Sequence, residues 1–314
     1  MRILFWGTPD FALPSLRALL GEGHDVVGVV TRPDRRAGRG RAVRASPVKE
    51  CAESEHLPVL QPERARGADF LTHLRALEPE LSVVVAYGQI LRPEVLALPP
   101  RGSLNVHASL LPELRGAAPI NWAIIRGHAE TGITVMRMVA RMDAGPILLQ
   151  VSEPIGEDET ASDLSARLSE IGAEALIETL TLLEEGGLSE REQDESRVTF
   201  APRLERKDAR IDWNLDAESV ARWMRGLDEA PGAWTLLDRT EVKLFRPLAL
   251  PQLPATAEPG TVLGASAHDP SAGVLVACGA GAVHVREVKP AGKRRMTAAE
   301  WVRGRGVRSG DRLG

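Results

Sequence analysis

The sequence predicts an α/β protein, with a Rossmann-like, mostly parallel sheet in its first part and a smaller, OB-like β-barrel in its second. In the first part, short valine-rich runs alternate with helical patterns, which is typical of βαβ units whose sheet is covered on both faces. Beyond about residue 210, short strand-like runs are separated by glycines and prolines, as in a small barrel. At 314 residues the chain is also too long for one ordinary core. We therefore expect one domain over residues 1–189, a polar linker over 190–208 and a second domain over 209–314.

The chain opens as strand, turn and helix. Residues 3–6 form an apolar strand, and the helix that follows is expected to have Thr8 as its N-cap and Pro9 in its first turn. A dinucleotide-binding enzyme would carry G-x-G-x-x-G at this place. The turn holds a single glycine, Gly7, so the sequence argues against an NAD-dependent enzyme in spite of the similar topology.

A basic segment follows the second strand, which is expected over residues 26–30. Residues 31–49 contain seven Lys or Arg and one acid, Asp34, with glycines and prolines among them. This composition predicts an exposed loop that leads to a helix with Ser46 as its N-cap. The loop is either a solvated charged surface or a basic finger that reaches for phosphates.

The remaining elements continue the alternation. In the first domain we expect strands over residues 58–60, 81–86, 104–107, 132–139 and 146–151, and helices over 46–55, 68–77, 92–97, 118–126 and 160–184. In the second domain we expect a helix over 217–227 and strands over 241–245, 260–263, 273–277 and 282–288. Residues 201–314 carry 18 Lys or Arg against 14 Asp or Glu, although the whole chain has a net charge of −4. A mildly basic second part favours a polyanionic partner.

Composition argues against several classes of protein. Cys51 and Cys278 lie far apart in the sequence, so they form neither a disulfide framework nor a metal-binding spacing. No apolar run approaches the ~20 residues of a membrane span, and the opening residues lack the cleavage region of a secretory signal. We therefore expect a cytoplasmic protein that makes no membrane contact.

The stretch SLNVHASLLPELRG, residues 103–116, carries the candidate chemistry. Asn105 and His107 lie two apart in an apolar run, so both side chains fall on one face of a strand. In parallel α/β sheets, chemistry gathers just beyond the ends of such strands, and Asp143 could bring a carboxylate to His107 there. Ser109 lacks the G-x-S-x-G setting of a nucleophile. The set therefore suits direct attack of an amine on a carbonyl, in which the amide stabilises the oxyanion, the imidazole transfers a proton and the carboxylate orients the imidazole.

Each of these residues also has a purely structural interpretation. Taken singly, Asn105 is typical of a strand end, His107 of a satisfied core histidine and Asp143 of a turn. Two polar side chains on one face of a buried strand need partners, however, which favours a functional interpretation of the set. His107 lacks the neighbouring ligand residues of a zinc site, so no metal is expected.

Motifs over almost the whole chain resemble those of the methionyl-tRNA formyltransferase family. They are GTPDFA (7–12), PDRRAGRG (33–40), SPVK (46–49), VVVAYGQIL (83–91), NVHASLLP (105–112), RGAAPI (115–120), ETGITVM (130–136), MDAG (142–145), ARIDW (209–213) and PAGK (290–293). The pattern NVHxSLLPxxRGxAPI is specific to folate-dependent formyltransferases. The basic loop and the second domain narrow the resemblance to the tRNA-formylating enzymes.

The resemblance implies transfer of the formyl group of 10-formyltetrahydrofolate, a co-substrate, to the amino group of methionyl-initiator tRNA. It implies a tetrahedral intermediate stabilised by the catalytic residues Asn105, His107 and Asp143. It implies a folate site made by Tyr87, Gly88, Ile90, Ser109, Leu110, Leu111 and Pro112. It implies tRNA contacts by Arg35, Arg36, Arg39 and Arg41 of the basic loop, and by Lys293, Arg294 and Arg295 of the second domain. It implies neither metal nor NAD, and we expect a monomer.

Three departures from the family pattern are visible, and two other functions stay open. The first departure is Glu113-Leu114, which stands where the family usually has more basic or aromatic residues. Ala108 stands where the family usually has Gly, and Ala144 where it usually has Thr, so a possible hydrogen bond near the site is missing. A formyltransferase that acts on an amino-sugar nucleotide or another small amine would share the catalytic set without needing the basic loop. A folate- or RNA-binding module without turnover would not need the catalytic set at all.

Overall fold

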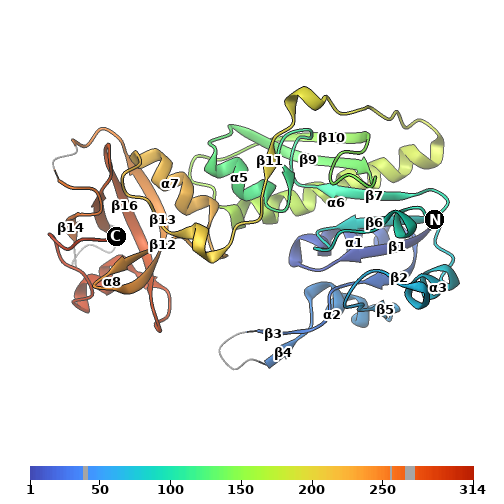
Figure 1. The fold of residues 1–314 in the computed structure, drawn as a ribbon, viewed down its shortest axis with the longest axis horizontal. Helices are drawn as coiled ribbons and strands as arrows, with labels where there is room; N and C mark the ends of the chain where they lie inside the picture. Colours follow the sequence, from blue (N-terminus) through green and yellow to red (C-terminus); the bar gives the residue numbers. More distant parts are fainter. Residues whose placement is uncertain (38–41, 255–256, 266–272) are drawn as a thin grey trace. The chain divides into compact units, whose positions relative to one another are not determined.

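The chain folds into two compact units. The computed structural model describes residues 1–37, 42–254, 257–265 and 273–314 (Figure 1). The first unit comprises Met1–Pro119, Glu130–Pro154 and Ser165–Pro202. The second comprises Ile120–Ala129, Ile155–Leu164 and Arg203–Gly314. The predicted fold class is confirmed, since the first unit is built on a mostly parallel sheet and the second on an antiparallel one.

A seven-stranded sheet in the order β10-β9-β7-β6-β1-β2-β5 forms the centre of the first unit. Its strands are β1 (Arg2–Gly7), β2 (Asp25–Val30), β5 (Val59–Leu60), β6 (Leu81–Val85), β7 (Ser103–His107), β9 (Glu130–Arg137) and β10 (Ile147–Pro154). The pairs from β7 to β5 are parallel, whereas β9 is antiparallel to both of its neighbours. The valine-rich runs arise because strands such as β6 are buried along their whole length.

The helices of this part of the chain fall close to where the periodicity predicts them. They are α1 (Leu13–Gly21), α2 (Pro47–Ser54), α3 (Ala68–Ala76), α4 (Pro93–Leu96), α5 (Pro119–Ile125) and α6 (Ala161–Glu185). Ser46 is the N-cap of α2, as predicted, and its side chain accepts a hydrogen bond from the Lys49 N–H. The predicted N-cap at Thr8 is wrong. A short 3₁₀ helix, η1 (Asp10–Ala12), precedes α1, and the Thr8 hydroxyl instead donates to the carbonyl of Tyr87 in the loop after β6.

The basic segment 31–49 is not a plain loop. Two short strands within it, β3 (Arg35–Ala37) and β4 (Ala42–Arg44), pair antiparallel. At its base Lys49 Nζ lies 2.7 Å from an oxygen of Asp34. The predicted tRNA contacts Arg39 and Arg41 lie outside the described residues, as does the side chain of Arg36.

The segment after α6 returns to the first unit. It contains the 3₁₀ helix η2 (Glu195–Arg197) and β11 (Phe200–Ala201), which pairs in parallel with β8 (Arg115–Gly116). The region expected as a linker, 190–208, is therefore divided. Its residues up to Pro202 pack in the first unit, and those from Arg203 onward, which include the 3₁₀ helix η3 (Arg206–Ala209), pack in the second.

An antiparallel sheet in the order β12-β13-β16-β15-β14, with β17 beside β16, forms the second unit. Its elements are α7 (Ala217–Gly226), β12 (Trp234–Leu237), β13 (Thr240–Leu250), β14 (Val262–Ala265), β15 (Val274–Ala277), β16 (Ala282–Pro290), β17 (Met296–Thr297) and α8 (Ala298–Arg303). Leu313 bridges β12 at Leu237, and Arg312 bridges Thr261 beside β14. Residues 310–314 thereby join the two edges of the sheet into a barrel. In the part of the chain that the structure describes, no helix is long and apolar enough to cross a membrane.

Candidate active site

Strand β7 carries Asn105 and His107 toward the end of the parallel strands. Asn105 lies opposite Met136 of β9, and His107 lies opposite Thr134 two positions on, so both side chains share a face of the sheet. His107 is buried and Asn105 is half-buried. Among the residues that the structure describes, the side-chain amide of Asn105 has no hydrogen-bond partner. An amide held by a strand and left without a partner is well placed to bind a ligand.

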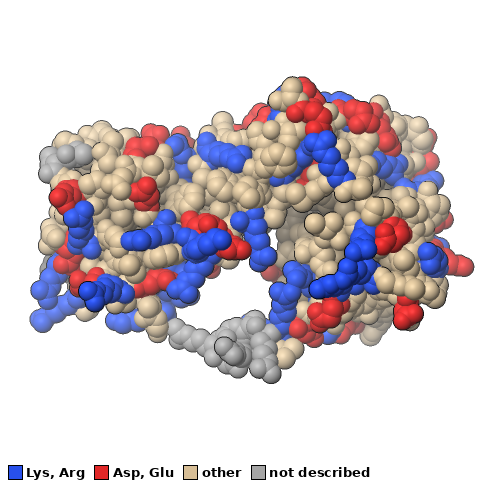
Figure 2. All heavy atoms as spheres, viewed as in Figure 1, with Lys and Arg blue, Asp and Glu red and all other residues tan. Residues whose placement is uncertain are grey.

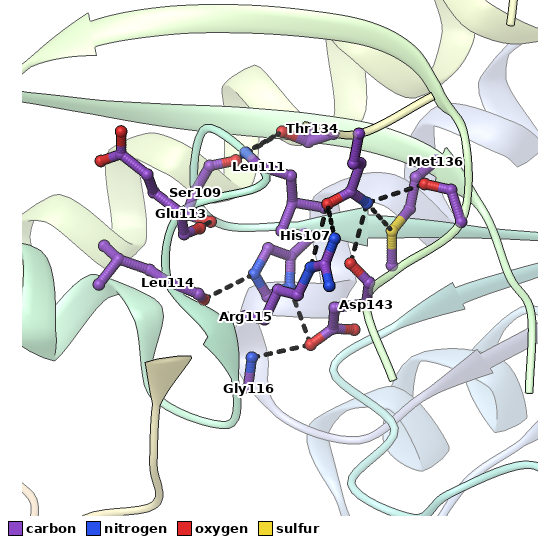
Figure 3. Close-up of polar contacts among 12 residues, drawn as sticks. His107, Ser109, Leu111, Glu113, Leu114, Arg115, Gly116, Thr134, Met136 and Asp143 are labelled. Atoms are coloured by element: carbon purple, nitrogen blue, oxygen red, sulfur yellow. Dashed lines mark hydrogen bonds and ion pairs between the residues drawn. The ribbon is translucent and has the colours of Figure 1, made fainter. Parts of the chain in front are cut away.

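The imidazole of His107 lies between a backbone carbonyl and a carboxylate (Figure 3). Its Nε2 lies 3.1 Å from the carbonyl oxygen of Leu114. A carbonyl only accepts, so Nε2 carries the proton of this hydrogen bond. Its Nδ1 lies 3.9 Å from Oδ2 of Asp143, which is too long for a hydrogen bond and close enough for electrostatic attraction to a charged ring. Nδ1 is therefore the ring nitrogen that remains available to take up a proton.

Asp143 is held by its backbone and by its side chain. Its φ is 50°, in the left-handed region that aspartate tolerates better than most residues. Its Oδ2 accepts a hydrogen bond from the Gly116 N–H at 2.8 Å. Two residues on, a Cβ on Gly145 would lie 1.9 Å from the carbonyl oxygen of Arg137, so only glycine fits at this position. The D-x-G pattern thus follows from the tight turn that returns the carboxylate to His107.

Polar groups of the loop after β7 are hydrogen-bonded within the protein. The Ser109 hydroxyl is fully buried and donates to the carbonyl of Glu113 at 2.7 Å. The Thr134 hydroxyl donates to the carbonyl of Ser109 and accepts from the Leu111 N–H. A serine whose hydroxyl is buried and engaged in this way is not available as a nucleophile.

Arg115 and Gln193 are buried site residues that sequence reasoning missed. Arg115 is 1% exposed, and its Nε and Nη2 both donate to Oε1 of Gln193. The same Nη2 donates to Glu195, and these bonds together with those from Arg141 lower the pKa of the Glu195 carboxyl. Gln193 lies in the segment expected as a linker. A lone glutamine in a polar, aperiodic stretch gives no local signal of burial.

The residues predicted to bind the folate differ in exposure. Ser109, Leu111 and Pro112 are buried, and Leu110 is partly buried. The side chain of Tyr87 packs edge-on against Trp6 in the core, and burial raises the pKa of its hydroxyl to about 12. Contact between Tyr87 and a ligand would therefore have to use its backbone. Gly88 and Ile90 are exposed, and the Ile90 side chain is 80% exposed.

The residues predicted to bind tRNA differ in whether their charged groups are exposed or paired within the protein. Figure 2 shows many Lys and Arg side chains, with acidic ones among them, on the visible face. Arg35 of β3 and Lys293 are exposed, and Arg294 pairs with Glu300. Arg295 is engaged within the protein. Its guanidinium stacks 4.0 Å from the Phe245 ring centroid, and it makes ion pairs with Glu229 and Glu287.

The described residues contain no group of three or more His, Cys, Asp or Glu that could hold a metal ion. Both cysteines are buried, and burial raises the pKa of the Cys278 thiol to about 12.

Comparisons with known proteins match both units. Residues 1–180 match the model of the family described as formyl transferase, and residues 203–306 match that of the formyl transferase C-terminal domain. The methionyl-tRNA formyltransferase of Geobacter sulfurreducens is 44% identical over all of this chain and 97% of its own length. That of Methylococcus capsulatus is 46% identical over the full length of both chains.

Solved structures share the fold at lower identity. A substituted variant of HypX from Aquifex aeolicus superimposes with a TM-score of 0.68 and 21% identity over 98% of this chain, which covers 48% of the HypX chain. WlaRD, a sugar 3N-formyl transferase, superimposes with a TM-score of 0.65 and 15% identity over 94% of this chain and 99% of its own. At such low identities the structural similarity supports only a shared fold. The sequence relatives, in contrast, are more than 40% identical over the whole length of this chain. The two family models and the full-length relatives together establish that this chain belongs to the methionyl-tRNA formyltransferase family.

Proposed function

We propose that the protein transfers the formyl group of 10-formyltetrahydrofolate to the α-amino group of methionyl-initiator tRNA. The products are N-formylmethionyl-tRNA and tetrahydrofolate. The observation that carries the chemistry is the convergence of Asn105, His107 and Asp143 at one end of β7, beside a serine whose hydroxyl is already engaged. Full-length similarity to curated methionyl-tRNA formyltransferases supports the choice of substrate.

Each residue of the site has a separate role in a direct transfer of the formyl group. A new N–C bond forms between the amine and the formyl carbon, the C–N bond of the donor breaks, and a proton passes from the amine to the departing nitrogen. The unpartnered amide of Asn105 donates to the formyl oxygen as that oxygen gains negative charge, and such a donor is typically worth about 10²–10³ in rate. His107 takes up the proton at Nδ1, because Nε2 is held by Leu114. Asp143 stabilises the imidazolium that results.

The surroundings of the site suit a flat, partly apolar donor. The loops that follow β6 and β9 carry three of the large apolar side chains that are exposed in this structure: Ile90, Val139 and Met142. Exposed apolar side chains beside a polar site are typical of a surface that a ligand covers. We assign the folate contacts to the loops that follow β6 and β7, through Gly88, Ile90 and residues 109–112, rather than to the buried ring of Tyr87.

The basic side chains support a nucleic-acid acceptor. Residues 31–49 carry seven Lys or Arg and one acid, and residues 201–314 have a small excess of positive charge in an otherwise acidic chain. We propose that Arg35, Arg36, Arg39 and Arg41 contact the tRNA from the basic segment, and that Lys293 and Arg294 contact it from the second unit. Arg295, with its internal ion pairs, is the weakest candidate of this set. We further propose a monomer that works in the cytoplasm.

One assay tests this proposal against its main alternative. Formyl transfer from 10-formyltetrahydrofolate is measured with methionyl-initiator tRNA, methionyl-elongator tRNA and a nucleotide-linked amino sugar, each at several concentrations. We expect kcat/KM to be highest for the initiator tRNA. Preferential transfer to the amino sugar would establish the second function instead, and would remove the role assigned to the basic segment. Binding of folate and tRNA without any transfer would overturn both.

A further inference from the structure

A closed ring of hydrogen bonds surrounds Asp143. Its Oδ2 accepts from the Gly116 N–H at 2.8 Å, and the preceding residue, Arg115, donates from Nε and Nη2 to Oε1 of Gln193 at 3.1 and 2.7 Å. Gln193 Nε2 then donates to the carbonyl oxygen of Asp143 at 2.9 Å, which closes the ring. The same Nε2 also donates to the carbonyl of Gly145 at 2.8 Å. One glutamine amide thus connects the two loops that face His107.

The ring is buried and electrostatically anchored. Arg115 is 1% exposed and Gln193 is 9% exposed. Glu195 supplies the counter-charge to Arg115 at 2.9 Å, and Arg141, two residues before Asp143, makes an ion pair with the other oxygen of Glu195. Hydrogen bonds between buried groups are stronger than exposed ones, and removing one partner leaves a costly unpaired group.

Asp143 benefits from this support because the left-handed region, although aspartate tolerates it better than most residues, is less favourable than the right-handed one. Its left-handed backbone, with φ of 50°, turns its carbonyl toward Gln193 and its carboxylate toward Gly116. Strained conformations at functional sites persist only where the surroundings determine them. The 3.9 Å separation between Asp143 Oδ2 and His107 Nδ1 consequently depends on a side chain that contacts neither of those two atoms.

We propose that Gln193 is a positioning residue for the formyl-transfer reaction, and that it acts by fixing the Asp143 carboxylate relative to His107. The proposal rests on the function proposed above. It assigns to the segment that follows α6, which packs in the first unit, a role in the catalytic step itself. Loss of this restraint lowers kcat and leaves KM for both substrates nearly unchanged, because the Gln193 side chain is 9% exposed and its amide is already engaged by Arg115, Asp143 and Gly145.

Two substitutions separate this role from a merely structural one. Gln193→Met keeps the length and burial of the side chain and removes both hydrogen-bonding functions. Gln193→Glu keeps the acceptor for Arg115 and removes the N–H donor to Asp143 and Gly145. We expect kcat to fall about 10- to 100-fold in both variants, as is typical when a reacting group is displaced by about 1 Å. Near-normal kcat in Gln193→Glu would show that only the charge of Arg115 needs a partner, and would overturn the proposal.

A double-mutant cycle with Asp143→Asn provides the second readout. If Gln193 acts through the carboxylate, Gln193→Met costs less than about 3-fold in kcat once that carboxylate is gone, since effects of coupled residues do not add. Full additivity would overturn the proposal even if both single variants are slow. The exposed neighbour Glu192, changed to Gln, is the matched control and should retain wild-type kcat. Thermal unfolding of all variants checks that they fold. The cycle uses whichever amine the wild-type enzyme formylates. An error in the assignment of the acceptor therefore leaves the test of Gln193 intact.

Discussion

The Nε2 nitrogen of His107 donates to the carbonyl oxygen of Leu114 at 3.1 Å, and Leu114 holds a left-handed backbone with φ of 58°. The Leu114 N–H is in turn bound by the Thr199 hydroxyl, from the segment that pairs with β8. A leucine pays a conformational cost in this region, so its surroundings must hold it there. The arrangement leaves Nδ1 as the working nitrogen of the ring. Through Leu114, the segment that contains Thr199 also helps to determine which nitrogen of His107 carries the proton.

Replacing His107 by Ala should lower kcat by about three orders of magnitude, because the site loses its proton-transfer group and the cation that Asp143 stabilises. Steady-state formyl transfer measures this loss. His73, whose ring on α3 is exposed and hydrogen-bonded within its own helix, supplies the matched control as His73→Ala. A His107→Ala enzyme within 10-fold of wild type would remove His107 from the mechanism.

Asn105→Ala should lower kcat about 10²–10³-fold with little change in KM for the donor, because its amide acts on charge that develops only in the transition state. Stability should change little, since the side chain has no hydrogen-bond partner within the described residues. Parallel kinetic and thermal-unfolding measurements check both statements. A rise in KM with kcat intact would instead indicate that Asn105 binds the ground state and the transition state equally well.

Glu195→Gln should make the free energy of unfolding less dependent on pH in the acidic range. Hydrogen bonds from Arg115 and then Arg141 lower the pKa of this carboxyl from its ordinary 4.5. The folded protein therefore binds fewer protons here than the unfolded chain, and the stability it contributes is fully present above pH 4.5 and is lost as pH falls through the lowered pKa. Urea unfolding between pH 3 and 7 should give curves for wild type and variant that converge at the acid end. A constant difference at every pH would contradict this assignment.

Lys293→Ala should weaken tRNA binding, whereas Arg295→Ala should mainly lower the stability of the fold. Lys293 is exposed, so its loss should weaken tRNA binding, lower the slope of log Kd against log salt by about 1, and leave stability within about 0.5 kcal/mol. Arg295 stacks on Phe245 and pairs with Glu229 and Glu287, so its loss should cost about 1–2 kcal/mol of stability. Binding titrations at several salt concentrations and urea unfolding separate the two. Equal effects of both substitutions on the salt slope would contradict the distinction.

Local patterns predicted the parts of the fold and site that depend on local physics. The period of two in β7 places Asn105 and His107 on one face, and the Ser-Pro pair at residues 46 and 47 begins α2, as expected. Thr8 was misassigned because its hydroxyl finds a partner in Tyr87, which is 79 residues away. Rules for helix capping consider only neighbouring residues, so they do not include a distant carbonyl that binds the same hydroxyl.

The segment that contains Gln193 shows the other limit of sequence reasoning. Its strand β11 is two residues long, and it pairs with β8, about 85 positions earlier. Its buried glutamine is surrounded in sequence by exposed charged residues, so neither periodicity nor composition marks it. Such long-range pairing depends on the completed sheet, and only the folded structure brings these groups together.

The closure of the second unit by residues 310–314 has a consequence for biosynthesis. Strands β12 and β14 complete their edge contacts only with this last segment, through Leu237 and Thr261. A ribosome that has made β12 to β17 therefore holds a sheet in which the β14 edge and the Leu237 end of β12 are still unpaired, and exposed edges readily pair with other chains. The first unit can fold while the nascent chain grows, but the barrel closes only after residues 310–314 have left the exit tunnel. In that interval, the open part of the sheet edge is available for pairing with other chains.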